Sequence, residues 1–117
     1  MEEALFRTML FDSYGELLTE KQREYFDLHY NEDFSLAEIA QSEGVSRQSV
    51  WDIIRRAEET MRRFEEKTGL VARFAAERDI LAAAREKLAR LETMTDGDAQ
   101  RLAREIAAAL QELGHGI

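Results

Sequence analysis

The stretch that decides the fold runs from Phe34 to Ile54 and is FSLAEIAQSEGVSRQSVWDII. Ser35 followed three residues later by Glu38 is typical of a capping box, in which two side chains satisfy the free backbone N–H groups at a helix start. Gly44 supplies the left-handed backbone that a tight turn needs, and Ser46 can cap a second helix. The stretch therefore predicts two helices joined by a short turn, the arrangement of a helix-turn-helix.

Apolar residues in this stretch occupy positions that a helix crossing requires. Ala40 is small, so the second helix can pass close to the first. We expect four larger side chains to fill the wedge between the helices: Ile39, Val45, Val50 and Ile54. Any two packed helices can show a related pattern, and a true helix-turn-helix also serves as a protein interaction platform, so the motif leaves both uses open.

Outward from this stretch, the whole chain favours helix. Its 117 residues contain no proline and are rich in Ala, Leu, Glu, Arg and Gln, which predicts an all-α fold of five to six helices. Gly15 and Gly69 are predicted to end the first and fourth helices. The predicted helices span residues 2–14, 19–30, 35–42, 46–67 and 70–92, and a last one runs from a cap at Thr95 or Asp96 to a stop at Gly114 and Gly116.

The composition changes along the chain. All ten aromatic residues lie between Phe6 and Phe74, and the 43 residues that follow contain eleven alanines. Large rings allow a dense core, whereas alanine-rich helices pair closely in hairpins. We expect a helix-turn-helix domain over residues 1–69 and a C-terminal helical hairpin for oligomerisation over residues 70–117. Two such thin helices bury little area and need to pack against the head or a second copy, which favours a homodimer.

Charge is distributed unevenly. The formal net charge is −8, and residues 1–45 carry three basic against eleven acidic side chains. Residues 46–69 are nearly balanced, with six basic and five acidic side chains. An acidic surface repels phosphates and suits a partner rich in Lys and Arg. The charge therefore keeps a protein-binding adaptor open beside a nucleic-acid-binding protein.

The candidate nucleic-acid-binding residues lie at the start of the second helix of the motif. A helix that enters the major groove presents its first residues to base edges and phosphates. Arginine pairs bidentately with guanine, glutamine pairs with adenine, and serine bonds phosphate or base. The candidates are Arg47, Gln48, Ser49, Trp51, Arg55 and Arg56.

Two features complicate this interpretation. Asp52 lies among the candidates, and a phosphate backbone repels a carboxylate unless the carboxylate accepts a hydrogen bond from a cytosine amine. Alternatively, Trp51 packs against the first helix of the chain, and the arginines pair along their own helix with Glu58 and Glu59. Both interpretations remain open at the level of sequence.

Several classes of function are disfavoured. The chain has no cysteine, which excludes disulfides, thiolate nucleophiles and cysteine-ligated metals. His29 and His115 stand alone, and we find no metal-ligand spacing, phosphate loop or nucleophile–base pattern, so no enzyme, cofactor or metal is expected. An acidic N-terminus and the lack of an apolar run near 20 residues predict a cytoplasmic protein without membrane insertion.

A family resemblance adds to these inferences. Residues 17–61, including REYFDLHY, SLAEIAQSEGVSRQSV and RRAEETM, resemble region 4 of bacterial sigma factors. The run from LLTEKQREYF through VSRQSVWDIIRRAEETMRRFEEKTGL is similar to the YlxM family of small bacterial proteins, and the similarity covers roughly residues 1–75. The resemblance implies a sigma-like helix-turn-helix regulator that binds DNA, encoded beside signal recognition particle genes and linked to that pathway.

The resemblance also indicates positions and partners. It implies that the DNA-contacting positions are Arg47, Gln48, Ser49 and Trp51. The alternative is an adaptor that contacts the protein or RNA of the signal recognition particle and does not bind DNA.

Overall fold

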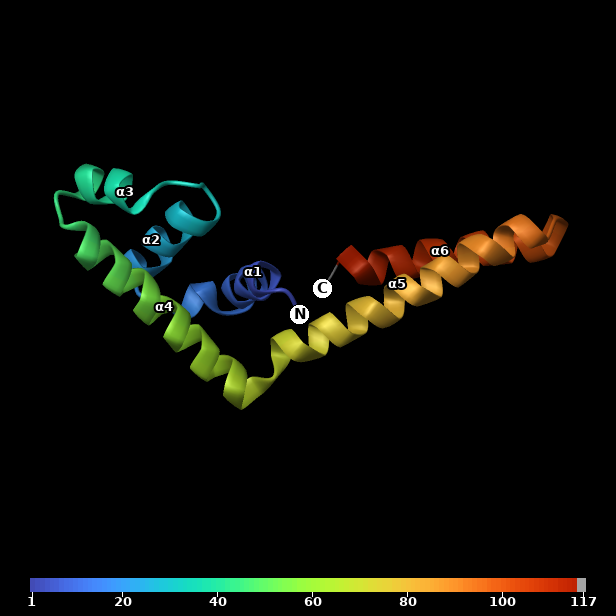
Figure 1. Ribbon diagram of the computed structural model, residues 1–117. Coiled ribbons are helices and arrows are strands. Elements are labelled where there is room, and N and C mark those ends of the chain that lie inside the picture. Colours follow the sequence, from blue (N-terminus) through green and yellow to red (C-terminus); the bar gives the residue numbers. More distant parts are fainter. Residues whose placement is uncertain (116–117) are drawn as a thin grey trace. The chain divides into compact units, whose positions relative to one another are not determined.

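The computed structural model describes the backbone of residues 1–115 and the side chains of residues 1–113. This part of the chain forms α-helices and one 3-10 turn without any strand, which confirms the all-α prediction. Its elements are α1 (Glu3–Tyr14), η1 (Gly15–Leu17), α2 (Glu20–Tyr30), α3 (Leu36–Glu43), α4 (Arg47–Thr68), α5 (Leu70–Met94) and α6 (Gly97–His115). They make two compact units, Met1–Val71, here called the head, and the tail from Ala72 onward (Figure 1).

Side-chain caps set the starts of three head helices. The predicted capping boxes at Thr19 and at Ser35 are both complete. At the second box, the Ser35 hydroxyl accepts from the Glu38 backbone N–H and the Glu38 carboxylate accepts from the Ser35 N–H, both at 3.0 Å. Ser46 accepts from the Ser49 backbone N–H at 3.0 Å, which fixes where α4 begins. These caps confirm the predicted helix starts.

Two glycines end head helices with a left-handed backbone. Gly44 has φ +70° after α3, and Gly69 has φ +64° after α4. The turn between α3 and α4 therefore depends on a conformation that other residues adopt at a cost. Both stops match the sequence prediction.

Of the other predicted glycine stops, Gly15 directly follows the last residue of α1 as predicted, whereas Gly114 does not end α6. Gly15 has a right-handed backbone with φ −55° and continues α1 into η1. A Cβ at this position would lie 3.2 Å from the Phe11 ring, so close packing accounts for the glycine. Helix α6 runs through Gly114 to His115, and Gly116 lies outside the described residues.

The long helix α4 organises the head, and α1, α2 and α3 all pack against it (Figure 1). Ile39, Val50 and Ile54 are buried between α3 and α4 as predicted, and Ala40 is buried at the same crossing. Val45 is 38% exposed, so its predicted place in the wedge is wrong. Its backbone N–H bonds the Ala40 carbonyl at 3.1 Å, which holds Val45 in the turn and off both helix faces.

A half-buried ion-pair network joins α1 to α4. The Arg7 Nε donates to Glu58 Oε1 at 2.7 Å, and the Arg62 Nε donates to Glu58 Oε2 at 3.1 Å. The Arg7 guanidinium also lies 4.3 Å from the centroid of the Tyr30 ring. Burial opposes ionisation of Glu58, but hydrogen bonds from the two arginines outweigh it and hold the pKa of this carboxyl below its ordinary value.

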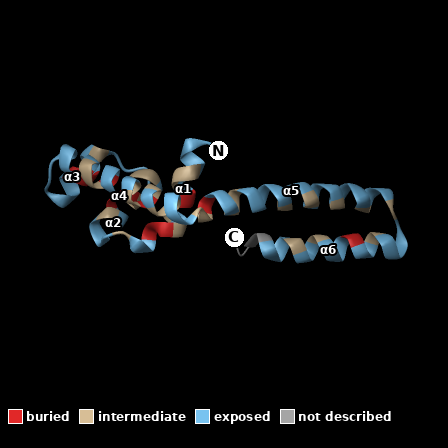
Figure 2. Ribbon diagram, turned by 90° about the horizontal axis from the view of Figure 1, so that it is seen from below, coloured by how far each residue is buried: buried red, intermediate tan, exposed pale blue. Residues whose placement is uncertain are grey.

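The tail is an antiparallel pair of helices, side by side in both ribbon views (Figures 1 and 2). Glu92 links them, since its carboxylate accepts from Arg104 Nε at 2.6 Å and its carbonyl from Gln100 Nε2 at 3.2 Å. The Thr95 hydroxyl donates back to the Leu91 carbonyl at 2.8 Å and thus bonds the end of α5, where a cap on α6 was one of two predicted options.

Candidate nucleic-acid interface

The start of α4 lies on the surface of the head. Val50 and Ile54 are buried on the inner side of the helix, which turns the residues between them outward. Arg47, Gln48 and Ser49 are all exposed, and no described part of the chain covers them. The geometry of a helix-turn-helix with an open second helix is therefore present.

Trp51 is 38% exposed, one turn after the start of α4. Its ring is therefore not buried against α1, which disagrees with the packing alternative. The aromatic contacts of the head core instead join rings of α1, α2 and α4, such as Phe11 with Phe26 at 5.2 Å and Tyr14 with Phe64 at 5.8 Å.

The middle of the exposed face carries a chain of polar contacts centred on Asp52. The Gln48 Nε2 donates to Asp52 Oδ1 at 3.1 Å, and the Arg55 Nη2 lies 3.9 Å from the same oxygen. Arg55 also pairs with Glu59 at 2.7 Å. The predicted pairing of an arginine with Glu59 is thus present, whereas Glu58 pairs with Arg7 and Arg62.

The two flanks of this chain differ from its middle. At 100° per residue, Arg47 and Trp51 lie on one flank, and Ser49 and Arg56 lie on the other. Within residues 1–113, Arg47 and Arg56 form no ion pair. The Ser49 hydroxyl accepts from Ser46 Oγ at 2.9 Å and so belongs to the cap.

The six predicted residues therefore fall into two groups. Three are exposed: the Trp51 ring, and Arg47 and Arg56, which form no ion pair among the described residues. Three have their polar groups engaged by neighbours on α4 or its cap: Gln48, Ser49 and Arg55. From the sequence, Asp52 is an obstacle to phosphate contact. The sequence analysis missed its hydrogen bond with Gln48, although residues four positions apart on a helix are neighbours.

A second feature of the head is an acidic groove of about 490 Å³ beside α2, lined by Phe11, Glu16, Glu20, Arg23, Glu24 and Asp27. Arg23 pairs with Glu16 at 3.0 Å, which leaves the groove negative. Burial, with the neighbouring Glu43, raises the pKa of Glu24. The groove thus combines carboxylates with one aromatic ring.

In the part of the chain that the structure describes, neither a metal site nor a membrane-spanning helix is found. Among the described residues, no three His, Asp or Glu side chains gather where they could hold a metal ion. Nor does the described chain contain a helix long and apolar enough to cross a bilayer. The His29 Nδ1 lies 2.8 Å from the Phe34 carbonyl, so this imidazole ties α2 to the segment before α3.

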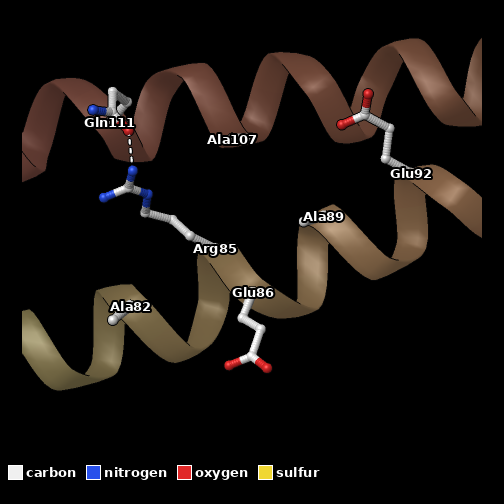
Figure 3. Close-up of a pocket in the computed structure, with 7 residues that line it drawn as sticks. All are labelled: Ala82, Arg85, Glu86, Ala89, Glu92, Ala107 and Gln111. Atoms are coloured by element: carbon white, nitrogen blue, oxygen red, sulfur yellow. Dashed lines mark hydrogen bonds between the residues drawn. The ribbon is translucent and has the colours of Figure 1, made fainter.

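The tail contains a cleft of about 450 Å³ between α5 and α6 (Figure 3). Its lining includes Ala82, Ala89 and Ala107, and Arg85 crosses it to donate to Gln111. Glu86 points away from α6 in this view. The cleft therefore results from small side chains that leave the two helices incompletely packed.

Comparison with known proteins identifies the family. A family model described as "Putative helix-turn-helix protein, YlxM / p13 like" matches residues 1–100. A UPF0122 protein of Halalkalibacterium halodurans is 41% identical over 113 residues, 97% of this chain and 95% of that protein. A UPF0122 protein of Thermoanaerobacter sp. strain X514 is 51% identical over 72 residues, and this alignment spans only 62% of either chain.

These matches confirm the predicted resemblance to the YlxM family and extend it beyond residue 75 into the tail. Because the family model covers most of the sequence and a relative matches nearly the whole of it, the chain belongs to the UPF0122 family of YlxM/p13-like helix-turn-helix proteins.

Proposed function

We propose that this protein is a non-enzymatic regulator that binds double-stranded DNA through the start of α4. The observation that carries the proposal is the exposure of Arg47, Trp51 and Arg56 on the second helix of a helix-turn-helix. In this mode, Arg47 and Gln48 contact base edges, Arg55 and Arg56 contact phosphates, and Ser49 bonds a phosphate or base. The exposed Trp51 ring offers an apolar surface to a thymine methyl.

The net charge makes this binding weak and sensitive to salt. Phosphate contacts release counterions, so affinity falls steeply as salt rises, with a slope that counts the contacts. Few arginines on α4 lack a partner, and the acidic residues of the head repel the duplex. We expect binding at low salt and a marked loss at physiological salt, unless the target sequence supplies specific contacts.

A homodimer belongs to the same proposal, and the exposed side of the tail is its interface. Six large apolar side chains of α5 and α6 are at least 43% exposed: Ile80, Leu91, Met94, Leu102, Ile106 and Leu113. In each helix the half-buried residues mark the side that faces the other helix. The exposed apolar residues of α5 and those of α6 lie about a quarter turn around the helix from that side, in the same direction of rotation. Because the helices run antiparallel, the two sets share one surface, here called the tail face.

A second copy is the partner that fits the tail face. Ala103 is the one tail side chain below residue 114 that is fully buried, so the hairpin lacks a core of its own. Two tail faces packed together make a four-helix bundle, in which each helix buries an apolar stripe. A dimer also presents two α4 helices, which suits a DNA site with two half-sites.

A binding titration tests the proposal. Fluorescence anisotropy with random-sequence duplexes of about 30 base pairs should show binding at roughly 50 mM salt and weaker binding at roughly 150 mM. Changing Arg47 and Gln48 together to Ala should abolish it. Lys67→Ala removes one positive charge about 30 Å along α4 and should bind nearly as the wild type does. Absence of binding by the intact protein at both salt concentrations would reject the proposal.

The acidic groove beside α2 favours a second candidate, an adaptor. Glu20, Glu24 and Asp27 around the Phe11 ring suit a basic, amphipathic segment of a partner protein. The implied link to the signal recognition particle makes its protein and RNA the first partners to test. A pull-down should then capture the particle's protein, Glu20→Lys should weaken capture, and the matched tail variant Glu105→Lys should not.

Both candidates act in the cytoplasm, as expected from the sequence. The pull-down and the DNA titration separate them, since an adaptor binds its partner while ignoring DNA at low salt. Selection of bound sequences from a random DNA pool would then give the target site, with the Arg47 and Gln48 double variant as the control.

A further inference from the structure

Asp52 occupies the middle of the exposed face of α4, between the two flanks of candidate contact residues. It is the only acidic side chain within residues 47–57. Its Oδ1 accepts from Gln48 Nε2 at 3.1 Å and lies 3.9 Å from Arg55 Nη2. This carboxylate therefore binds Gln48 and lies within ion-pair distance of Arg55, whose shorter contact, at 2.7 Å, is to Glu59.

This arrangement has a cost when the helix meets DNA. A carboxylate at this position lies close to the phosphates and is repelled by them, and removing it from water without a donor is unfavourable. Gln48 must also leave Asp52, and Arg55 must leave Glu59 and Asp52, before they can bond bases or phosphates. On an arbitrary sequence, nothing offsets these losses.

One base pair compensates best for the repulsion and desolvation of the Asp52 carboxylate. In the major groove, cytosine presents its N4 amino group as a donor, and a carboxylate accepts from it. Adenine also presents an amino group, but its N7 acceptor lies beside it and repels a carboxylate oxygen. Guanine and thymine present acceptors at the corresponding edge, so they leave the carboxylate without a partner.

We infer that Asp52 is a specificity-determining residue that makes the DNA target contain a C·G pair opposite the start of α4. In free protein the carboxylate accepts a hydrogen bond from Gln48, and a cytosine amino group takes the place of that donor in the specific complex. The same carboxylate lowers affinity for all other sequences. This inference rests on the proposed DNA binding and adds to it a base and a selecting residue.

Selection from a random DNA pool with the wild type, Asp52→Asn and Asp52→Ala tests it. The wild-type pool should keep a fixed cytosine that both variants lose. Both variants should bind random-sequence duplexes about threefold or more tightly than the wild type at low salt, with less difference at high salt. Replacing the fixed cytosine in the selected site should weaken wild-type binding at least about fivefold and the variants little.

Glu66→Gln is the matched control, because it makes the same charge change on the same helix. Fourteen residues separate it from Asp52, about 21 Å along the axis, which exceeds the screening length at physiological salt. It should leave the selected sequence and the affinity at physiological salt unchanged. Thermal unfolding followed by circular dichroism confirms that each variant is folded before binding is compared.

The outcomes are distinguishable. If the wild type binds DNA through Arg47 but the Asp52 variants keep the same fixed bases and bind random DNA no more tightly, the inference is wrong and the proposed function stands. If Glu66→Gln changes binding as much as Asp52→Asn, general charge explains the effect and the inference is wrong. If neither the wild type nor any folded variant binds DNA, the proposed function fails, and the inference fails with it.

Discussion

The head and the tail are both helical, but they are stabilised differently. In the head, rings and branched side chains interdigitate, and eight large side chains are almost completely buried: Tyr25, Phe26, Leu10, Ile39, Ile54, Met61, Val50 and Val71. In the tail, Leu81 and Leu88 are only half buried, and large apolar side chains such as Ile80 and Met94 are exposed (Figure 2). The burial therefore follows the position of the large side chains in the sequence.

The comparison shows that helix propensity and a core are separate requirements. Alanine-rich sequence forms helices readily, yet each alanine contributes little apolar area for a neighbour to cover. The head can fold on its own core, whereas the tail needs a surface that its two helices do not supply. If this is correct, substitutions in the two units should respond differently to protein concentration.

The largest expected effect is on the head core. Ile54→Ala should lower the free energy of unfolding by about 2–5 kcal/mol, because Ile54 is 1% exposed and its removal leaves a cavity. Urea unfolding followed by circular dichroism measures this loss, which should not depend on protein concentration. Ile106→Ala is the matched tail variant, and its cost should rise with concentration as the dimer forms. Equal, concentration-independent costs would contradict the difference between the units.

The next effect concerns the tail face. Ile106→Asp introduces a carboxylate into the proposed interface and should weaken dimerisation more than tenfold, as measured by sedimentation equilibrium. Ala108→Asp introduces the same charge into α6, turned about 160° away from Ile106, and should leave the dimer intact. A monomeric wild type, or equal loss in both variants, would argue against this face as the interface.

Local signals in the sequence were sufficient to predict much of the structure of the head. Capping boxes and the left-handed turn at Gly44 depend on residues within four positions, so spacing alone predicts them. The Asp52 contacts depend on the same spacing, but they concern side-chain conformations that base-contact reasoning did not address. The predicted position of Val45 in the wedge was wrong because helical periodicity does not apply to a residue in a turn.

Contacts between residues far apart in the sequence were harder to predict from the sequence. The partners of Glu58 lie on α1 and α4, and nothing local indicates that Arg7 reaches it. In the tail, the large apolar Leu102 and Ile106 of α6 are exposed, whereas Ala103 is buried and Ala107 is half-buried. Two adjacent apolar stripes on α6 are each compatible with the sequence, and only three-dimensional packing decides which one α5 covers.

A smaller effect is expected at the turns, where the two units can be compared with the same substitution. Gly44 has φ +70° and Gly97 has φ +59°, and a Cβ at either position meets no atom within 4 Å. Alanine at each site therefore strains only the backbone, by about 1–2 kcal/mol. Gly44→Ala should lower the midpoint of head unfolding in urea, followed by fluorescence of Trp51.

Gly97→Ala should leave that head signal unchanged and lower only the helical signal of the tail. A change of Trp51 fluorescence midpoint in both variants would mean that the two units unfold as one.

The smallest expected effect concerns pH and the head ion pairs. A carboxyl whose pKa is lowered by folding stabilises the protein above its unfolded pKa, and this contribution disappears as the pH falls through the folded pKa. Glu58 is such a group, because its bonds to Arg7 and Arg62 outweigh the cost of burial. Glu24 acts in the opposite direction, since burial and Glu43 raise its pKa, so its protonation favours the folded state as the pH falls.

Glu58→Gln should therefore be less stable than the wild type at pH 7 and lose less stability between about pH 5 and pH 3, the range in which glutamates titrate. Glu105→Gln in the tail changes the net charge equally and should follow the wild-type curve in urea titrations of the head signal. Parallel curves for Glu58→Gln and the wild type would show that the Arg7–Glu58–Arg62 contacts do not hold α1 against α4. The stability of the head, and its difference from the tail, would then rest mainly on apolar burial, since the Arg7–Glu58 ion pair is a polar contact that joins α1 to α4.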